Sequence, residues 1–581
     1  MSPQKKFLIR SHILQSSIYL GFIIILLRLF YWQIIKGDEL NEIATRQYER
    51  LDISEASRGS IFTSDGYLLV GNQPVYRLFA EKNLLENNPK QISQLLTPLI
   101  LTNDRPYKLA SQAAKKEIIE ENTKKNIKEK LEKTEKNWIG LRHNISEELK
   151  QEIENLQIKG LGFDKYEKRF YPEASLAAHV TGFVGKNKIG EDLGYFGIEG
   201  ALNNELKPYS RKHTSLTDAL GLKLLFKSNS NSSAIDGRDV STTINRNVQV
   251  LIEEELKAAV LRYEAKSGEV IVMDPKSGKI LGMASFPSYD QELFYKYDTS
   301  LYKNPSLSEN YEPGSTFKAI TIAAGIDSKA IKENSKCDSC DKARKIGKYT
   351  IKTWNDEYHP DIDMKEALAI SDNTAMIFAA EKIGTEKFLK YIKNFGIGNE
   401  IGIDLQEDSG TPFSDKWGPV ELATRSFGQG IVINSMQLVR AIASIANDGK
   451  MMKPQIIEKV LDKKNNQEIL VEPKKVMQVI SKESAHTVKK MLAYTVEKSL
   501  PSLAKKRSYS VAGKTGTSQI ANDSGGYKED GTIASFIAFS PVDKPKFIML
   551  VKLNEPSTSP WGAETAAPLW FKIADKLQLL L

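Results

Sequence analysis

The chain has few cysteines and few histidines, and these scarcities exclude several classes of protein. Only Cys337 and Cys340 occur in 581 residues, so disulfide bonds are not the main support of the fold. The six histidines are scattered, and no motif places one beside a candidate nucleophile. This argues against a hydrolase of the serine–histidine–aspartate type. Glycine motifs that bind phosphate or dinucleotides are also lacking.

A basic motif with interleaved aromatic residues is lacking as well. The net charge of +8 is small beside 81 basic and 73 acidic residues, so we expect no nucleic-acid partner. A content of 41% hydrophobic and 27% charged residues is typical of a globular protein. The length predicts two or three domains.

One long apolar run is present, close to the N-terminus. Residues 13–35, "ILQSSIYLGFIIILLRLFYWQII", exceed the roughly 20 residues that cross a bilayer. No small-residue cleavage site follows, so we expect an uncleaved membrane anchor rather than a signal peptide or a buried core helix. Lys5, Lys6 and Arg10 precede the run. The positive-inside rule therefore predicts a cytoplasmic N-terminus and a single pass through the cell membrane, with the rest of the chain outside.

The remaining chain changes character near residue 240. Residues 110–156 are rich in lysine and glutamate with apolar residues at helical spacing, which predicts solvated amphipathic helices. In contrast, "SGEVIVMDPKSGKILGMASFP" (267–287) predicts a β-hairpin. Three strand-like runs and an amphipathic helix end the chain. This pattern predicts one sheet flanked by helices over 240–581.

The stretch "EPGSTFKAITIAAGI" carries a candidate nucleophile. Pro-Gly ends an extended segment, and the residues after it favour a helix start. Ser315 and Lys318 are three apart, so on a helix they share a face. A desolvated lysine loses its proton more easily and can act as base to a serine hydroxyl. A lone Ser-x-x-Lys occurs by chance in many proteins, however, and by itself it favours two ordinary surface residues.

Two further motifs follow in order. Ser371-Asp-Asn373 lies at a break between helical runs, where polar side chains can face a cleft. Lys514-Thr515-Gly516-Thr517 lies in a predicted strand, where the glycine permits a close backbone approach and the lysine and threonines can hold a carboxylate. This trio of motifs occurs in penicillin-binding proteins and class A β-lactamases.

With these motifs the chain resembles a class B penicillin-binding protein, a membrane-anchored peptidoglycan D,D-transpeptidase. The resemblance covers nearly the whole chain. "WGPVELATRSFGQGIVINSMQLVRAIASIANDGKMMKP" looks like the family's stretch before the third motif, and "SRGSIFTSDG", "RFYPEASLAAHVTGFVG" and "GIEG" look like its pedestal motifs. Residues 36–240 do not look like the glycosyltransferase domain of class A members.

The resemblance implies a fold and a division into domains. We expect an α/β (α+β) serine transpeptidase/β-lactamase-like domain with a central antiparallel sheet flanked by helices, preceded by an elongated pedestal and one transmembrane helix. The expected segments are a cytoplasmic tail (1–12), the anchor (13–35), the pedestal or dimerisation domain (36–240) and the transpeptidase domain (241–581). The implied partners are peptidoglycan stem peptides, β-lactams and a membrane glycosyltransferase, in cell-wall synthesis during division or elongation.

The resemblance also implies a role for each site residue. Ser315 would form the acyl-enzyme, Lys318 would take its proton, and Ser371 would relay a proton to the leaving amine with Lys514 nearby. Asn373 would bind the peptide backbone. The substrate carboxylate would be held by Thr515 and Thr517, with Gly516 between them. No cofactor and no metal are implied.

Some features depart from the family pattern or leave alternatives open. Thr63 and Ser64 replace an Asp-Arg pair of the first pedestal motif, which removes an expected ion pair there. Cys337 and Cys340 favour a local disulfide, with a free pair or a metal site as alternatives. A D,D-carboxypeptidase, a β-lactamase-type hydrolase and a non-catalytic scaffold or sensor remain the alternative functions.

Overall fold

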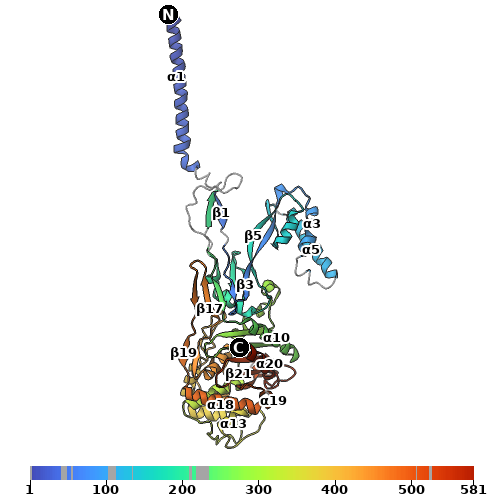
Figure 1. Ribbon diagram of the computed structural model, residues 1–581, viewed down its shortest axis with the longest axis vertical. Coiled ribbons are helices and arrows are strands. Elements are labelled where there is room, and N and C mark those ends of the chain that lie inside the picture. The colour runs from blue at the N-terminus through green and yellow to red at the C-terminus, as the bar shows by residue number, and fades with distance from the viewer. Residues whose placement is uncertain are drawn as a thin grey trace. The chain divides into compact units, whose positions relative to one another are not determined.

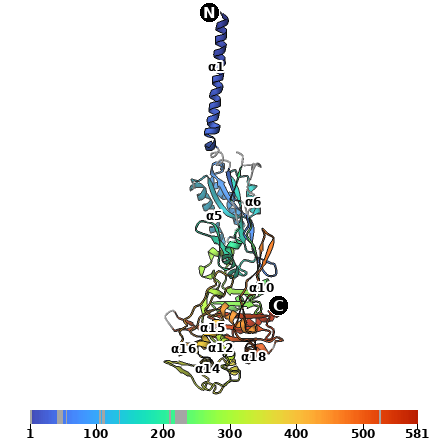
Figure 2. The same cartoon turned by 90° about the vertical axis from the view of Figure 1, so that its left-hand side faces the viewer.

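The computed structural model describes residues 3–40, 49–53, 56–102, 107, 113–133, 135–208, 212–216, 235–505, 507–522 and 526–581. They form two compact units (Figures 1 and 2). One contains Met1–Ala56 and Pro208–Asp236, and the other contains Ser57–Lys207 and Gly237–Leu581.

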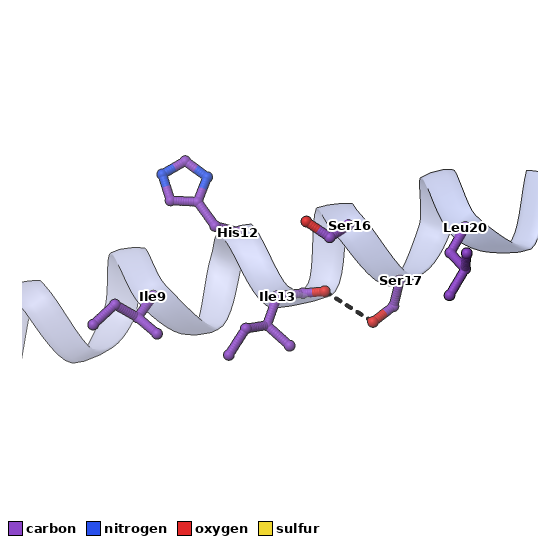
Figure 3. A pocket seen from close by; sticks show the side chains of 6 residues that line it. All are labelled: Ile9, His12, Ile13, Ser16, Ser17 and Leu20. Carbon is purple, nitrogen blue, oxygen red and sulfur yellow. Dashed lines mark hydrogen bonds between the residues drawn. The ribbon is translucent and has the colours of Figure 1, made fainter.

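The first unit contains the expected apolar helix. Helix α1 (Pro3–Phe30) continues into a π-helical turn, η1 (Tyr31–Ile35). Leu8–Ile35 is the one span among the described residues that is long and apolar enough to cross a membrane. The Ser17 hydroxyl donates to the Ile13 carbonyl at 2.8 Å (Figure 3), which satisfies this polar group within an apolar helix. Strands β1 (Glu49–Ile53) and β8 (Lys212–Leu216) pair antiparallel.

A five-stranded antiparallel sheet forms the centre of the second unit. The order is β11-β10-β22-β21-β20. The strands are β10 (Ser267–Met273), β11 (Ile280–Phe286), β20 (Ala512–Ala521), β21 (Tyr527–Ser540) and β22 (Phe547–Asn554). The expected β10–β11 hairpin, the three late strands and the final helix are all confirmed. Because strand side chains alternate between faces, buried runs such as Val270–Met273 supply both sides of the sheet.

Helices cover both faces of this sheet (Figure 1). On one face, α10 (Arg246–Arg262) and α20 (Ala566–Leu580) pack on Val270, Phe536 and Val551. The other face packs on a larger helical layer through Ile271, Ile537 and Leu550. The helices of this layer and its surroundings are α11 (Pro305–Ser308), α12 (Lys318–Asp327), α13 (Met364–Ala369), α14 (Asn373–Ile383), α15 (Thr385–Asn394), α16 (Pro419–Ser426), α17 (Ser435–Ala446), α18 (Lys482–Ser499) and α19 (Pro501–Ala504).

A second sheet joins strands from distant parts of the sequence. Its order is β18-β17-β9-β2-β3-β4, with β5 on β3. The strands are β2 (Ile61–Phe62), β3 (Leu68–Glu81), β4 (Trp138–Ile145), β5 (Leu161–Phe170), β9 (Asp239–Thr242), β17 (Ile457–Asp462) and β18 (Gln467–Leu470). The expected domain boundary at 240/241 falls inside β9, which pairs with β2 on one side and β17 on the other.

Residues 113–154 contain a strand where the sequence predicted only helices. Helices α5 (Ala113–Lys133) and α6 (Glu147–Glu154) are present, but β4 lies between them and pairs with β3. Ile139, Leu141 and Ile145 of β4 are buried in a core with α3 (Pro89–Thr102) and α5. The prediction was wrong here because the short period-two pattern of β4 is hidden among flanking lysines and glutamates.

The three pedestal motifs meet in one buried ion cluster. Glu199 is fully buried, and its carboxylate accepts from Arg58 Nε at 2.7 Å and Arg169 Nε at 2.6 Å. Arg58 also donates to Asn203 at 3.0 Å, and Arg169 donates to Asn72 at 2.9 Å. These bonds hold both guanidinium groups, which are less than a tenth exposed, against the one carboxylate.

The replacement of the Asp-Arg pair leaves this cluster intact. The Tyr67 backbone N–H donates to Thr63 Oγ1 at 2.9 Å, and the Ser64 hydroxyl donates to the Ile244 carbonyl at 3.1 Å. Thr63 thus closes a local turn and Ser64 connects it to Ile244, shortly before α10, both through neutral hydrogen bonds.

A Glu199→Ala substitution is expected to lower the free energy of unfolding by about 3 kcal/mol or more, because it leaves two buried arginines without a counter-charge. Glu205→Ala is a matched control, because the Glu205–Arg238 pair is about two-fifths exposed and should contribute at most about 1 kcal/mol. Urea unfolding followed by tryptophan fluorescence measures both. Equal losses in the two variants would contradict this account of the cluster.

Candidate active site

The candidate nucleophile lies in a tight turn that leads into a buried helix. Residues Gly314–Phe317 form a 3₁₀ turn, η5, and α12 begins at Lys318. Gly314 has φ 55°, and a Cβ there would lie 3.1 Å from the Thr517 carbonyl oxygen. Only glycine meets both conditions without strain. The turn therefore brings Ser315 directly against strand β20.

Lys318 lies fully buried beneath this turn. Its Nζ donates to the Ser371 carbonyl at 2.6 Å, to Asn373 Oδ1 at 2.8 Å and to Ser371 Oγ at 3.1 Å. Burial, together with the positive charge of Lys514, holds the pKa of Lys318 well below 10.5, although the Asp372 carboxylate acts in the opposite direction. A neutral amine, which a general base requires, is thereby favoured.

The second motif occupies the break between α13 and α14, as predicted. Ser371 has φ 63°, a left-handed conformation that costs about 1 kcal/mol for a residue with a Cβ. Asp372 Oδ1 accepts from the Ala375 N–H at 3.0 Å and so caps α14. The strained backbone at Ser371 points its carbonyl and its hydroxyl to the same Lys318 amine.

The third motif lies on β20, at the edge of the central sheet. A Cβ on Gly516 would lie 2.8 Å from Thr316 Cγ2 and 3.2 Å from the Pro313 carbonyl oxygen, so a side chain there would push β20 away from the serine turn. Lys514 is 2% exposed, and burial lowers its pKa to about 8. Thr517 Oγ1 accepts from the Gly562 N–H at 3.1 Å.

These elements enclose one cleft of about 780 Å³. Five of the expected residues line it, namely Ser315, Ser371, Lys514, Thr515 and Thr517. The other three support them from below: Lys318 and Asn373 bond to each other beside Ser371, and Gly516 packs on the serine turn. The structure therefore brings all eight expected residues to one site.

Two tryptophans at the cleft were not predicted. Trp354 and Trp561 line the cleft in an edge-to-face pair with ring centres 5.4 Å apart. Both remain exposed, by 60% and 40%. A tryptophan in a polar loop, as in "KTWNDEYH" and "TSPWGAE", is the sequence signal that could have indicated them.

The two cysteines form a disulfide next to this region, as the sequence favoured. The Cys340 carbonyl accepts from the His359 N–H at 3.0 Å, and the Cys337 N–H donates to the Ile362 carbonyl at 2.9 Å. Among the described residues, no group of three or more His, Cys, Asp or Glu side chains could hold a metal ion.

Four features of this site together define the penicillin-recognising active-serine class. They are a serine at the start of a buried helix, a lysine three residues later, a turn with a serine and an asparagine that contacts this lysine, and a lysine on an edge strand. Residues 268–575 match the model of the penicillin binding protein transpeptidase domain, and residues 53–242 match the penicillin-binding protein dimerisation domain. The chain belongs to the penicillin-binding protein transpeptidase family, and it is a class B member.

Individual relatives agree with this assignment. Stage V sporulation protein D of Bacillus subtilis (strain 168) is 33% identical over 555 residues, which cover 94% of this chain and 82% of that protein. A peptidoglycan D,D-transpeptidase FtsI homolog of Mesostigma viride is 26% identical, over 97% of this chain and 93% of the relative. The crystal structure of penicillin binding protein 2X from Streptococcus thermophilus shares the fold, with a TM-score of 0.73, 22% identity and coverage of 91% of this chain and 80% of that one.

Proposed function

We propose that this protein is a peptidoglycan D,D-transpeptidase that cross-links stem peptides through an acyl-enzyme on Ser315. The observation that carries the proposal is the fully buried Lys318, which is bonded to Asn373 and to Ser371, and Ser371 lines the same cleft as Ser315. A desolvated lysine in this position supplies the base that a serine hydroxyl needs near neutral pH.

In the proposed reaction, Ser315 Oγ attacks the carbonyl carbon of the penultimate D-alanine, and its proton passes to Lys318 Nζ. The backbone N–H groups of Ser315 and Thr517 stabilise the oxyanion. The C–N bond then breaks, and Ser371 relays a proton to the departing D-alanine amine. An amine of a second stem peptide attacks the ester, forms the cross-link and restores the Ser315 hydroxyl.

The remaining residues orient the substrate. Lys514 supplies a positive charge, and Thr515 and Thr517 supply hydroxyl donors, for the terminal carboxylate. Asn373 binds the peptide backbone. Because β20 is an edge strand, its outer backbone groups are placed to pair with an extended substrate.

Hydrolysis of the same acyl-enzyme would make the protein a D,D-carboxypeptidase or a β-lactamase-type hydrolase. Turnover of a stem pentapeptide with and without an acceptor amine separates these functions. We expect a cross-linked dimer as the main product when acceptor is present. Release of free tetrapeptide alone under both conditions would contradict transpeptidation. A scaffold or sensor would release no D-alanine at all.

The rate of acylation is expected to follow a bell-shaped pH profile. It rises with pH as Lys318 loses its proton, because a base acts unprotonated. It falls above about pH 8, where Lys514 loses the charge that holds the carboxylate. A Lys514→Arg variant keeps its charge at high pH and should lack the falling limb. Stopped-flow acylation by a fluorescent penicillin between about pH 5 and about pH 10 tests this, and an unchanged falling limb in the variant would contradict the role of Lys514.

The orientation of the anchor is part of the proposal. Lys5, Lys6 and Arg10 favour a cytoplasmic N-terminus, with the catalytic domain outside the cell membrane. External protease added to intact spheroplasts should then digest the chain beyond about residue 40, and protection of that region would show the opposite orientation.

A membrane glycosyltransferase is the proposed partner, because a class B chain cross-links glycan strands that another enzyme must polymerise. Purification of the full-length protein from membranes in mild detergent should co-isolate such an enzyme. Isolation without any glycan-polymerising activity would count against this partner.

A further inference from the structure

Glu312 is an acidic residue of the nucleophile motif to which the mechanism above gives no role. It lies three residues before Ser315 and is half-buried. Its Oε1 accepts from the Gly430 N–H at 2.9 Å, and its Oε2 accepts from the Tyr527 hydroxyl at 2.9 Å. Among the described residues, no lysine or arginine forms an ion pair with it within 4 Å. The carboxylate therefore joins two neutral donors rather than balancing a charge.

These two donors belong to the two segments that flank the serine turn. Gly430 lies in the short loop between α16 and the strand Ile433–Asn434, and in the same loop the Gly428 carbonyl accepts from the Gly314 N–H at 3.1 Å. Tyr527 begins β21 and is the register partner of Ala521 at the end of β20. One side chain thus ties the loop, the approach to Ser315 and the β20–β21 hairpin together.

The two carboxylate bonds are well suited to set the position of the hairpin. Hydrogen bonds to an ionised acceptor are roughly twice as strong as neutral ones. The serine turn also packs closely on β20, with Gly314 beside the Thr517 carbonyl and Thr316 beside Gly516. A shift of about 1 Å at a reacting centre can cost about 10²-fold in rate.

We propose that Glu312 is a positioning residue for acylation, which fixes the β20–β21 hairpin against the Ser315 turn so that the backbone donors of Ser315 and Thr517 converge on the oxyanion. This proposal rests on the proposed function. The effect of Glu312 is expected on the acylation step rather than on ligand capture. Lys514, Thr515 and Thr517 all lie on β20 and keep their positions relative to one another when the hairpin shifts, whereas their alignment with Ser315 changes.

Stopped-flow acylation of the full-length protein in detergent by a fluorescent penicillin separates the dissociation constant Kd from the rate constant of acylation. Glu312→Gln would keep both bonds, because its amide oxygen accepts from the Gly430 N–H and its amide nitrogen donates to the Tyr527 hydroxyl. In Glu312→Met, a side chain of similar length accepts neither hydrogen bond, so both bonds are lost. We expect the acylation rate constant to fall about 10- to 100-fold, with Kd changed less than about threefold and Tm retained. An unchanged acylation rate constant, or a loss confined to Kd, would overturn the proposal.

Tyr527→Phe keeps the proposal testable if the first variant folds poorly, because Tyr527 is exposed and only one oxygen is removed. It should lower the acylation rate constant by about 3- to 10-fold. Tyr295→Phe, which removes a hydroxyl from an exposed tyrosine on the 3₁₀ segment Gln291–Lys296, should leave it unchanged. The double variant Glu312→Met/Tyr527→Phe should be no slower than Glu312→Met by more than about twofold, because Glu312→Met already removes the bond that Tyr527→Phe removes. A wild-type rate in Tyr527→Phe, or full additivity, would contradict the proposal.

The outcome for the wild-type protein separates this proposal from the proposed function. If wild-type protein is not acylated on Ser315, the proposed function fails. If it is acylated there and Glu312→Met and Tyr527→Phe react like wild type, only the positioning role of Glu312 fails.

Discussion

A Ser315→Ala variant is expected to show no covalent labelling by a fluorescent penicillin while keeping the wild-type Tm. A β-lactam resembles the D-Ala-D-Ala end of a stem peptide, because it presents a strained amide beside a carboxylate. The carboxylate should be bound by Lys514, Thr515 and Thr517. This binding places the amide carbon over Ser315 Oγ. The substitution removes one oxygen from a half-buried side chain, so it removes the nucleophile without disturbing the fold.

Labelling is measured by gel fluorescence after denaturation, so that only a covalent adduct is counted. Ser328→Ala, at the other end of α12, is the matched control and should label like wild type. Residual labelling of Ser315→Ala at the wild-type rate would show that another residue is acylated.

The second large effect is expected for Lys318→Ala. Loss of a general base typically costs about 10²- to 10⁴-fold, and Lys318 is the buried amine bonded to Ser371 and Asn373. The variant should therefore bind the drug with similar affinity and acylate about 10²-fold more slowly or worse. Stopped-flow kinetics at saturating penicillin give the rate constant directly.

Removal of a fully buried side chain also leaves a cavity, so a second variant is needed. Lys318→Met retains most of the buried volume and still lacks a base, and it should be as slow as Lys318→Ala. Lys332→Ala, an exposed lysine of the same region, serves as the control. If Lys318→Met acylated like wild type, Lys318 could not be the base.

Much of the catalytic fold could be predicted because its signals are local. The β10–β11 hairpin and the strands before α20 are apolar runs with turn residues between them. The second sheet could not be predicted, because β9 pairs with β2 and β17 from far parts of the chain and each of these strands is short. The period-two pattern of β4 was likewise too brief to stand out from its charged surroundings.

Site residues could be predicted where the chemistry of their side chains and their spacing in the sequence indicate the same role. Ser315 and Lys318 are neighbours in sequence, and the other two motifs were recognisable as a set. The contacts that connect them depend on tertiary structure. The Trp354–Trp561 pair and the Glu312–Tyr527 bond join residues about 200 positions apart, so no local pattern shows that these residues contact each other.

Mass mapping of the acyl-enzyme formed from a stem pentapeptide tests the central claim most directly. The full-length protein is mixed with donor pentapeptide in the absence of acceptor, quenched in acid and digested. The account predicts one adduct, with the mass of the pentapeptide less one D-alanine, on the peptide that contains Ser315, and its conversion to a cross-linked dimer when an acceptor amine is added before the quench. An adduct on any other residue, or a Ser315 adduct that acceptor amine never converts to dimer, would contradict it.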